Sequence, residues 1–151
     1  MAITSGGTLW GWGSNQNGQL GDGTTEDRHN PVRIMDGVTN ISIGGNTRMA
    51  ITLDGVLWGW GRNRTGVLGD GTTRDRSEPV KIMENVVSVS TSGLHTLAVT
   101  ADGNLWAWGE NTSGELGIGT YRGEYEQRPY RGSIPSAWLS PVLVLEYVPE
   151  G

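Results

Sequence analysis

The chain has 151 residues and no cysteine, which excludes disulfide bonds, thiolate catalysis and cysteine-ligated zinc sites. Acidic residues outnumber Lys and Arg by 16 to 11, and the net charge of −5 argues against nucleic acid as the main partner, because phosphate binding needs concentrated positive charge. The sequence contains no apolar run of about 18 residues, so no membrane-spanning segment is predicted.

The first seven residues, MAITSGG, lack the basic and apolar regions of a signal peptide. We therefore expect a cytoplasmic or a virion-associated location, and the sequence leaves these two open. Glycine (25 residues) and tryptophan (seven) are abundant, whereas phenylalanine is absent. This composition favours strands joined by tight turns, because glycine adopts positive φ at no steric cost.

One string occurs three times at a spacing of 48 residues. Trp10–Gly13 recurs as Trp58–Gly61 and, with Ala in place of the first Gly, as Trp106–Gly109. Each copy is followed by Asn-x-x-Gly-x-Leu-Gly, and the first two copies also by Pro-Val. The repetition predicts a single domain over residues 1–151 with three repeats, framed at about 2–49, 50–97 and 98–148.

In chain order, alternating apolar residues predict short strands at 41–43 and 49–51. Asp54 and Gly55 come next and favour a type I′ turn between antiparallel strands, as do the dipeptides at the equivalent positions. Residues 56–60 and 79–83 are the next predicted strands, and helical periodicity is absent throughout. The expected fold is all-β, with four antiparallel strands in each unit, as in a β-propeller blade.

The string Leu-Trp-x-Trp-Gly-x-Asn-x-x-Gly-x-Leu-Gly resembles the regulator of chromosome condensation repeat, and the likeness covers essentially the whole chain. The resemblance implies propeller blades arranged in a ring. Three blades are fewer than the roughly 4–8 of a typical propeller, so one chain is not expected to close the ring. Because unpaired strand edges invite association, we expect a homo-oligomer, in which two chains would supply six blades, or docking on a larger assembly.

The third unit departs from the other two by an insertion of 14 residues within 120–140, which moves its Pro-Val to Pro141 and Val142. Long loops in compact domains are often functional, and Arg, Tyr and Trp are enriched at interface hot spots. The insertion either contacts a partner or packs over a face of the propeller. The expected interaction residues within it are Tyr121, Arg122, Tyr125, Arg128, Tyr130, Arg131 and Trp138.

The last strand also changes character. Leu143 stands where the earlier units have Arg33 and Lys81, and Tyr147 follows shortly after it. The run 142–145 is apolar on both faces, which is typical of a strand covered on both sides. We expect the inserted loop or another subunit to cover this strand, and we include Leu143 and Tyr147 among the interaction residues.

The repeated tryptophans could form an aromatic platform for a ligand, but their presence in every unit favours a shared packing role with indole N–H groups bonded inside the fold. The glycines between them suggest close approach of neighbouring backbones. His95 occupies a position where the family commonly carries His, and the resemblance implies a structural hydrogen-bonding role. The expected structural residues are Trp10, Trp12, Trp58, Trp60, Trp106, Trp108 and His95.

The Gly-Asp-Gly-Thr-Thr segments at Asp22 and Asp70 resemble fragments of calcium loops, but the third unit has Ile118 there, so we expect turns. Asp27–Arg28 and its counterpart in the second unit are expected to form local turns or ion pairs. No phosphate-binding motif occurs, and neither histidine lies near a nucleophile motif. We therefore predict no catalytic, cofactor or metal site, and no enzyme.

These features favour a structural or adhesive assembly protein that binds other proteins, such as a component of a phage virion. The resemblance implies an alternative, a soluble regulator of a small GTPase of the nucleotide-exchange type, because the family includes a chromatin-bound exchange factor. A glycan-binding propeller is a further alternative. Fold alone does not choose among them.

Overall fold

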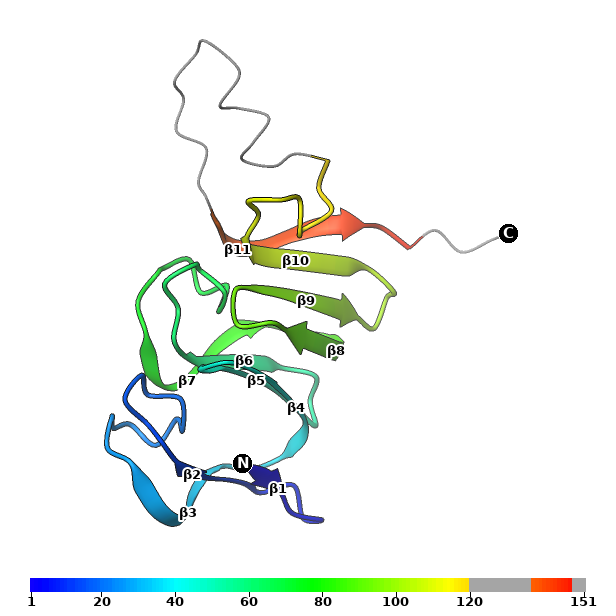
Figure 1. Ribbon diagram of the computed structural model, residues 1–151. Helices are drawn as coiled ribbons and strands as arrows, with labels where there is room; N and C mark the ends of the chain where they lie inside the picture. Colours follow the sequence, from blue (N-terminus) through cyan, green and yellow to red (C-terminus); the bar gives the residue numbers. More distant parts are fainter. Residues whose placement is uncertain (120–136, 148–151) are drawn as a thin grey trace.

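The structure is a computed structural model that describes residues 1–119 and 137–147. Every regular element in these residues is a β-strand, and the strands form three antiparallel sheets that follow one another along the chain (Figure 1). The all-β fold of blade-like sheets is thus confirmed, and the three sheets do not close into a ring. Since no helix occurs in the described part of the chain, none there could cross a membrane.

The first sheet has three strands and the other two have four. The first sheet consists, in spatial order, of β1 (Ala2–Ile3), β2 (Leu9–Gly13) and β3 (Arg28–Met35). The second consists of β4 (Val38–Gly44), β5 (Thr47–Thr52), β6 (Leu57–Gly61) and β7 (Arg76–Met83). The third has the order β11-β10-β9-β8, with β8 (Val86–Thr91), β9 (His95–Thr100), β10 (Leu105–Glu110) and β11 (Ala137–Leu145).

The pairing register repeats from sheet to sheet. The first tryptophan of the repeated string pairs with Arg33 in the first sheet, with Lys81 in the second and with Leu143 in the third. A register shift follows this pair each time, before the glycine that ends the Trp-x-Trp-Gly string. The strands that the sheets share therefore follow one design; the first sheet has one strand fewer, and the connection between β10 and β11 is longer in the third.

The turn between β5 and β6 differs from the expected type I′. Its Gly55 has φ of +76°, and Asn85 is the single non-glycine residue with positive φ in the described part of the chain, so Asp54 has negative φ. Type I′ requires positive φ at both central residues. Instead the Gly55 N–H donates to the Thr52 carbonyl (2.9 Å) and the Thr52 N–H to the Val56 carbonyl (3.0 Å). Asp favours this turn because its carboxylate accepts the Thr52 hydroxyl (2.6 Å).

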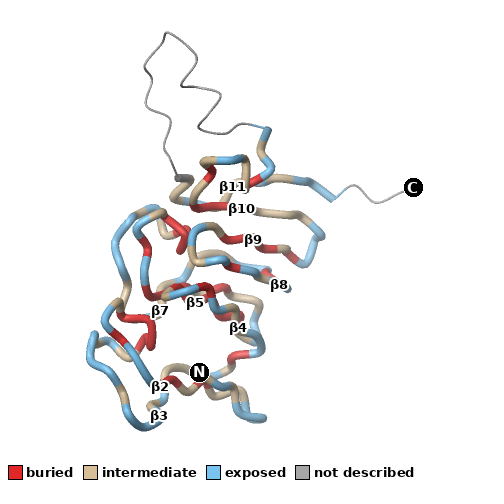
Figure 2. The backbone as a smooth tube through the Cα atoms, viewed as in Figure 1, coloured by how far each residue is buried: buried red, intermediate tan, exposed pale blue. Residues whose placement is uncertain are grey.

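The core consists of two apolar clusters, one at each contact between sheets. Leu9 and Val38 surround Trp60 in the first cluster. Met49 and Leu57 lie with Trp108 in the second. Figure 2 shows much of the buried backbone concentrated on the middle sheet, which contributes to both clusters. Each sheet therefore depends on its neighbour for burial, as in repeat proteins generally.

Candidate protein interface

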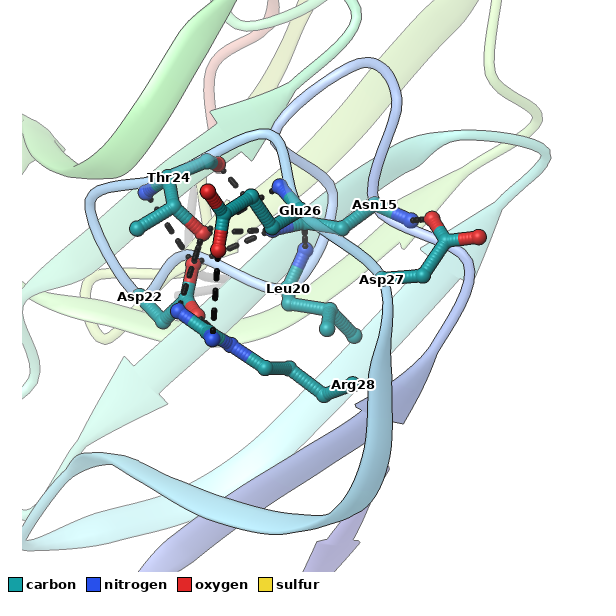
Figure 3. A network of polar contacts seen from close by, with 7 residues as sticks. All are labelled: Asn15, Leu20, Asp22, Thr24, Glu26, Asp27 and Arg28. Atoms are coloured by element: carbon teal, nitrogen blue, oxygen red, sulfur yellow. Dashed lines mark hydrogen bonds and ion pairs between the residues drawn. The ribbon is translucent and has the colours of Figure 1, made fainter.

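A buried asparagine organises the loop between β2 and β3 (Figure 3). The Asn15 side chain donates to Asp22 Oδ1 and to the Thr24 carbonyl, both at 3.0 Å, and its Oδ1 accepts the Leu20 N–H at 2.9 Å. One amide thereby serves backbone groups from both sides of the loop, and it gives a partner to the N–H of the buried Leu20. Asn63 repeats these bonds in the second sheet with nearly the same distances.

The carboxylate of Asp22 is used entirely by its own loop. Arg28 Nε donates to its Oδ2 at 2.6 Å, and Thr24 donates to its Oδ1 through both its N–H (3.1 Å) and its hydroxyl (2.7 Å). Burial raises the pKa of Asp22, but these bonds outweigh burial and hold the pKa below its ordinary value of 3.8. The described residues contain no group of three or more acidic or histidine side chains that could hold a metal.

Asp27 and Arg28, for which a local turn or an ion pair was expected, both form local contacts but do not pair with each other. Arg28 pairs with Asp22 instead, while Asp27 accepts the backbone N–H of Asn15 at 2.8 Å (Figure 3). Adjacent residues of an extended chain point to opposite sides, so neighbours in sequence rarely pair. The second sheet repeats the arrangement, with Arg76 bound to Asp70 and Asp75 bound to Asn63 N–H.

The second tryptophan of the string joins one sheet to the next. The indole N–H of Trp60 on β6 donates to the Gln19 carbonyl of the preceding sheet at 3.2 Å. That of Trp108 on β10 donates to the Val67 carbonyl at 2.8 Å, and both side chains have an exposed fraction of 0%. The first tryptophan of the string, by contrast, forms its indole hydrogen bond within its own sheet: Trp58 donates to the Thr52 hydroxyl and Trp106 to the Thr100 hydroxyl, both at 3.3 Å.

A glycine loop receives each of these buried indoles; we use this name for residues 18–21, 66–69 and 114–117. A Cβ on Gly21 would lie 2.7 Å from Trp60 Nε1, and one on Gly69 would lie 2.6 Å from Trp108 Nε1, so any other residue would have to displace the indole. From the sequence, a close approach of neighbouring backbones was expected at Gly11 and Gly59. Those two glycines instead face core side chains, such as Leu20 and Met49.

The expected interaction residues fall into two groups. Tyr121, Arg122, Tyr125, Arg128, Tyr130 and Arg131 lie outside the described residues. Trp138 on β11 is half-buried and packs against the second core cluster. Leu143 on β11 is 42% exposed, and Tyr147, which follows the end of β11, is 60% exposed while its N–H donates to Asn104 Oδ1 at 2.8 Å.

His95 lies at the start of β9, half-buried, beside the turn from β8. Its Nδ1 is 3.2 Å from the Ser92 hydroxyl oxygen, and its backbone N–H donates to the same oxygen at 3.2 Å. Both contacts brace the turn. A hollow nearby is lined by Arg62, Arg64 and Thr65 among others, but by no carboxylate, so it offers no acid–base pair.

The repeated sheets match a known family. The model of the "Regulator of chromosome condensation (RCC1) repeat" family matches residues 6–51, 54–99 and 102–144, and a second RCC1 repeat model matches 86–115. No curated protein sequence matches the chain. Among solved structures, Prp20p of Saccharomyces cerevisiae, described with its binding to Gsp1p and histones, is 22% identical with a TM-score of 0.76 over 96% of this chain.

Two further structures are similar. Human WBSCR16 is 25% identical with a TM-score of 0.69 over 93% of this chain, and yeast RCC1 (Prp20) bound to Kap60 is 26% identical with a TM-score of 0.69 over 95%. The chain spans 36%, 35% and 34% of the chains in these three structures, in the order given, or about a third of each. Because family models match nearly the whole length, the chain belongs to the regulator of chromosome condensation (RCC1) repeat family.

Proposed function

We propose that this chain is a non-catalytic protein-binding module in which residues 1–151 act as one three-repeat domain. The proposal is supported by the RCC1 repeats and by the fold shared with Prp20p, a protein described as binding Gsp1p and histones. These relatives favour the alternative of a soluble, protein-binding regulator over a structural protein. They give no support to the expectation of a virion component.

One observation carries the proposal, the exposed apolar surface of the last strand. In the first two sheets the equivalent position holds a cation with an acidic partner three residues later, Arg33 with Asp36 and Lys81 with Glu84. In the third sheet Leu143 replaces the cation, while Glu146 keeps the acidic position. Exposed apolar surface beside a carboxylate suits a protein partner with an apolar patch bordered by basic residues.

Two partner classes follow from the likeness to Prp20p: a small GTPase such as Gsp1p, and histones. The net charge of −5 favours the basic histones, because opposite charges steer association. Binding of purified histones and of GDP-loaded Gsp1p, each titrated calorimetrically, separates the two, and release of labelled GDP adds a readout of exchange activity. We expect at least one of these proteins to bind.

The variant Leu143→Arg restores the charge of the other two sheets and should weaken binding about 10-fold or more. Leu53→Arg is the matched control, because Leu53 is 84% exposed on a turn of the second sheet and should leave binding unchanged. Failure of both proteins to bind, or equal binding by the wild-type chain and Leu143→Arg, would contradict the proposal.

A further inference from the structure

The contact between consecutive sheets occurs twice within this chain and is made from the same parts. A tryptophan of the later sheet inserts against the glycine loop of the earlier sheet, Trp60 on residues 18–21 and Trp108 on residues 66–69. In each case the indole donates to the carbonyl of the loop's second residue. The two copies define what a complete contact between sheets requires.

A backbone hydrogen bond at the outer strand completes each contact. The Gly23 N–H donates to the Ser77 carbonyl of β7 at 2.9 Å, and the Gly71 N–H donates to the Leu139 carbonyl of β11 at 2.8 Å. The repeat offset makes His29 on β3 the counterpart of these carbonyl residues, and Gly119 the counterpart of the donors. A complete contact therefore combines one buried indole with one strand-edge bond.

The first sheet carries the tryptophan half of this contact without a glycine loop to receive it. Trp12 has an exposed fraction of 44%, whereas its counterparts Trp60 and Trp108 have 0%. The following residue shows the same difference, since Gly13 is exposed while Gly61 is buried. A tryptophan with this much exposed surface is typical of an interface anchor.

The third sheet carries the other half, a glycine loop without a tryptophan. Its loop has the same backbone shape as the filled ones, because the Gly117 N–H donates to the Gly114 carbonyl at 3.0 Å and the Leu116 N–H donates to Asn111 Oδ1 at 3.1 Å. Yet Gly117 is exposed where Gly21 is buried, and a Cβ there would meet only Val144 at 3.6 Å among the described residues. The receiving surface is preformed.

We propose that a second copy of this chain fills both half-sites: Trp12 of one chain inserts against residues 114–117 of another and donates to the Glu115 carbonyl. The Gly119 N–H of the chain that holds the glycine loop donates to the His29 carbonyl of the chain that holds Trp12, which forms the strand-edge hydrogen bond. A second copy is the occupant the structure favours, because every chain carries both halves and the contact continues an interface already present twice. Two chains would supply six sheets, within the roughly 4–8 of closed propellers.

The interface is heterologous, because unlike surfaces meet. It is also independent of the proposed function, since it uses the ends of the row of sheets and leaves Leu143 free. Sedimentation velocity and light scattering on the 151-residue chain measure association directly, whereas the calorimetric titrations use histones and Gsp1p. Self-association can therefore fail while histones or Gsp1p still bind, and the reverse is equally possible.

Two variants remove opposite halves. Trp12→Ala deletes the inserting side chain, and Gly117→Asn places a side chain where the indole should lie, in a residue type that tolerates the φ of +67°. Gly37→Asn is the matched control, because Gly37 has φ of +69° with nothing within 4 Å of its Cβ, and Asn85 already occupies the equivalent place. We expect the wild-type chain and the control to associate, and each interface variant to lose association about 10-fold or more.

A mixture of the two variants distinguishes a head-to-tail contact from general damage. The Trp12→Ala chain keeps an intact glycine loop and the Gly117→Asn chain keeps an intact tryptophan, so the equimolar mixture should regain one good contact and form a pair. Circular dichroism verifies that each variant is folded. A wild-type chain that stays monomeric at all concentrations, or variants whose mixture associates no better than either alone, would overturn the proposal and point to blades outside these residues as the occupants.

Discussion

At the scale of single residues, the loops between the last two strands of the first two sheets are held by one amide and one carboxylate each. Asn63 is buried and bonds to Asp70, to the Thr72 carbonyl and to the Leu68 N–H. Asp70 in turn accepts from Thr72 and Arg76. Every partner is a fixed group of the same loop, so the carboxylate has a structural task that requires its charge.

The charge of Asp70 makes part of the stability dependent on pH. Burial raises its pKa, but bonds from Thr72 and Arg76 outweigh burial and lower the pKa below 3.8. The folded pKa is thus below the unfolded pKa. The stability that the Asp70 carboxylate contributes is fully present above pH 3.8 and is lost as the pH falls through the pKa of the folded state.

Asp70→Asn should therefore lower the free energy of unfolding at pH 7 by about 1–2 kcal/mol, through loss of the charge-assisted bond to Arg76. At a pH below the folded pKa the difference from the wild-type chain should shrink, because the wild-type carboxyl is then protonated too. Urea unfolding at both pH values measures it. Asp36→Asn is the control, since Asp36 forms an exposed pair with Arg33 and should change little at either pH. A difference independent of pH would contradict the electrostatic explanation.

At the scale of elements, the unit of construction is the glycine loop of one sheet together with the tryptophan strand of the next. Gly69 meets two demands at once: its φ is +78°, and its missing Cβ leaves room for Trp108. Gly55 meets only the first, since its φ is +76° and a Cβ added there would lie 3.6 Å from its nearest neighbouring atom. Comparing the two glycines separates backbone strain from packing.

Substituting each glycine by alanine tests this separation. Gly55→Ala should cost about 1 kcal/mol of unfolding free energy, through positive φ alone. Gly69→Ala should cost about 2–4 kcal/mol, because the added methyl group also displaces the indole and lengthens its bond to Val67. Denaturant unfolding gives both values, and near-ultraviolet circular dichroism reports the Trp108 environment. Equal losses would show that the indole moves aside without cost.

How far the sequence predicts these elements depends on whether the signal is local. The 48-residue repeat and alternating apolar residues were sufficient for the all-β fold, because each depends only on neighbours along the chain. The turn type predicted at Asp54 was wrong, since Asp-Gly suits more than one turn. The sequence also did not reveal that Arg28 pairs with Asp22, because ion pairing depends on how the loop folds. The contact between Gly21 and Trp60 crosses between sheets, and spacing alone does not tell which glycine meets which tryptophan.

At the scale of the molecule, the three sheets are unequal although their sequences repeat. The middle sheet contributes to both apolar clusters, whereas the first sheet packs against one neighbour and its β1 has only two residues. In a row of units stabilised by nearest neighbours, the end units open first. In chains kept monomeric by dilution, amides of β5 and β6 should consequently exchange with solvent more slowly than those of β2.

Loss of one hydrogen bond between two sheets should speed local opening at that contact and leave the other contact between sheets unchanged. Trp60→Phe keeps most of the apolar contact but leaves the buried Gln19 carbonyl without its indole donor. The free energy of local opening should therefore fall by about 1 kcal/mol, which raises the open population roughly 5-fold. Hydrogen exchange should accelerate by this factor in β2 and β3 and stay unchanged in β9 and β10. Trp108→Phe is the mirror control, because its bond to Val67 joins the other pair of sheets. Equal acceleration in all three sheets would show instead that they open as one cooperative body, with burial across the middle sheet coupling the two ends.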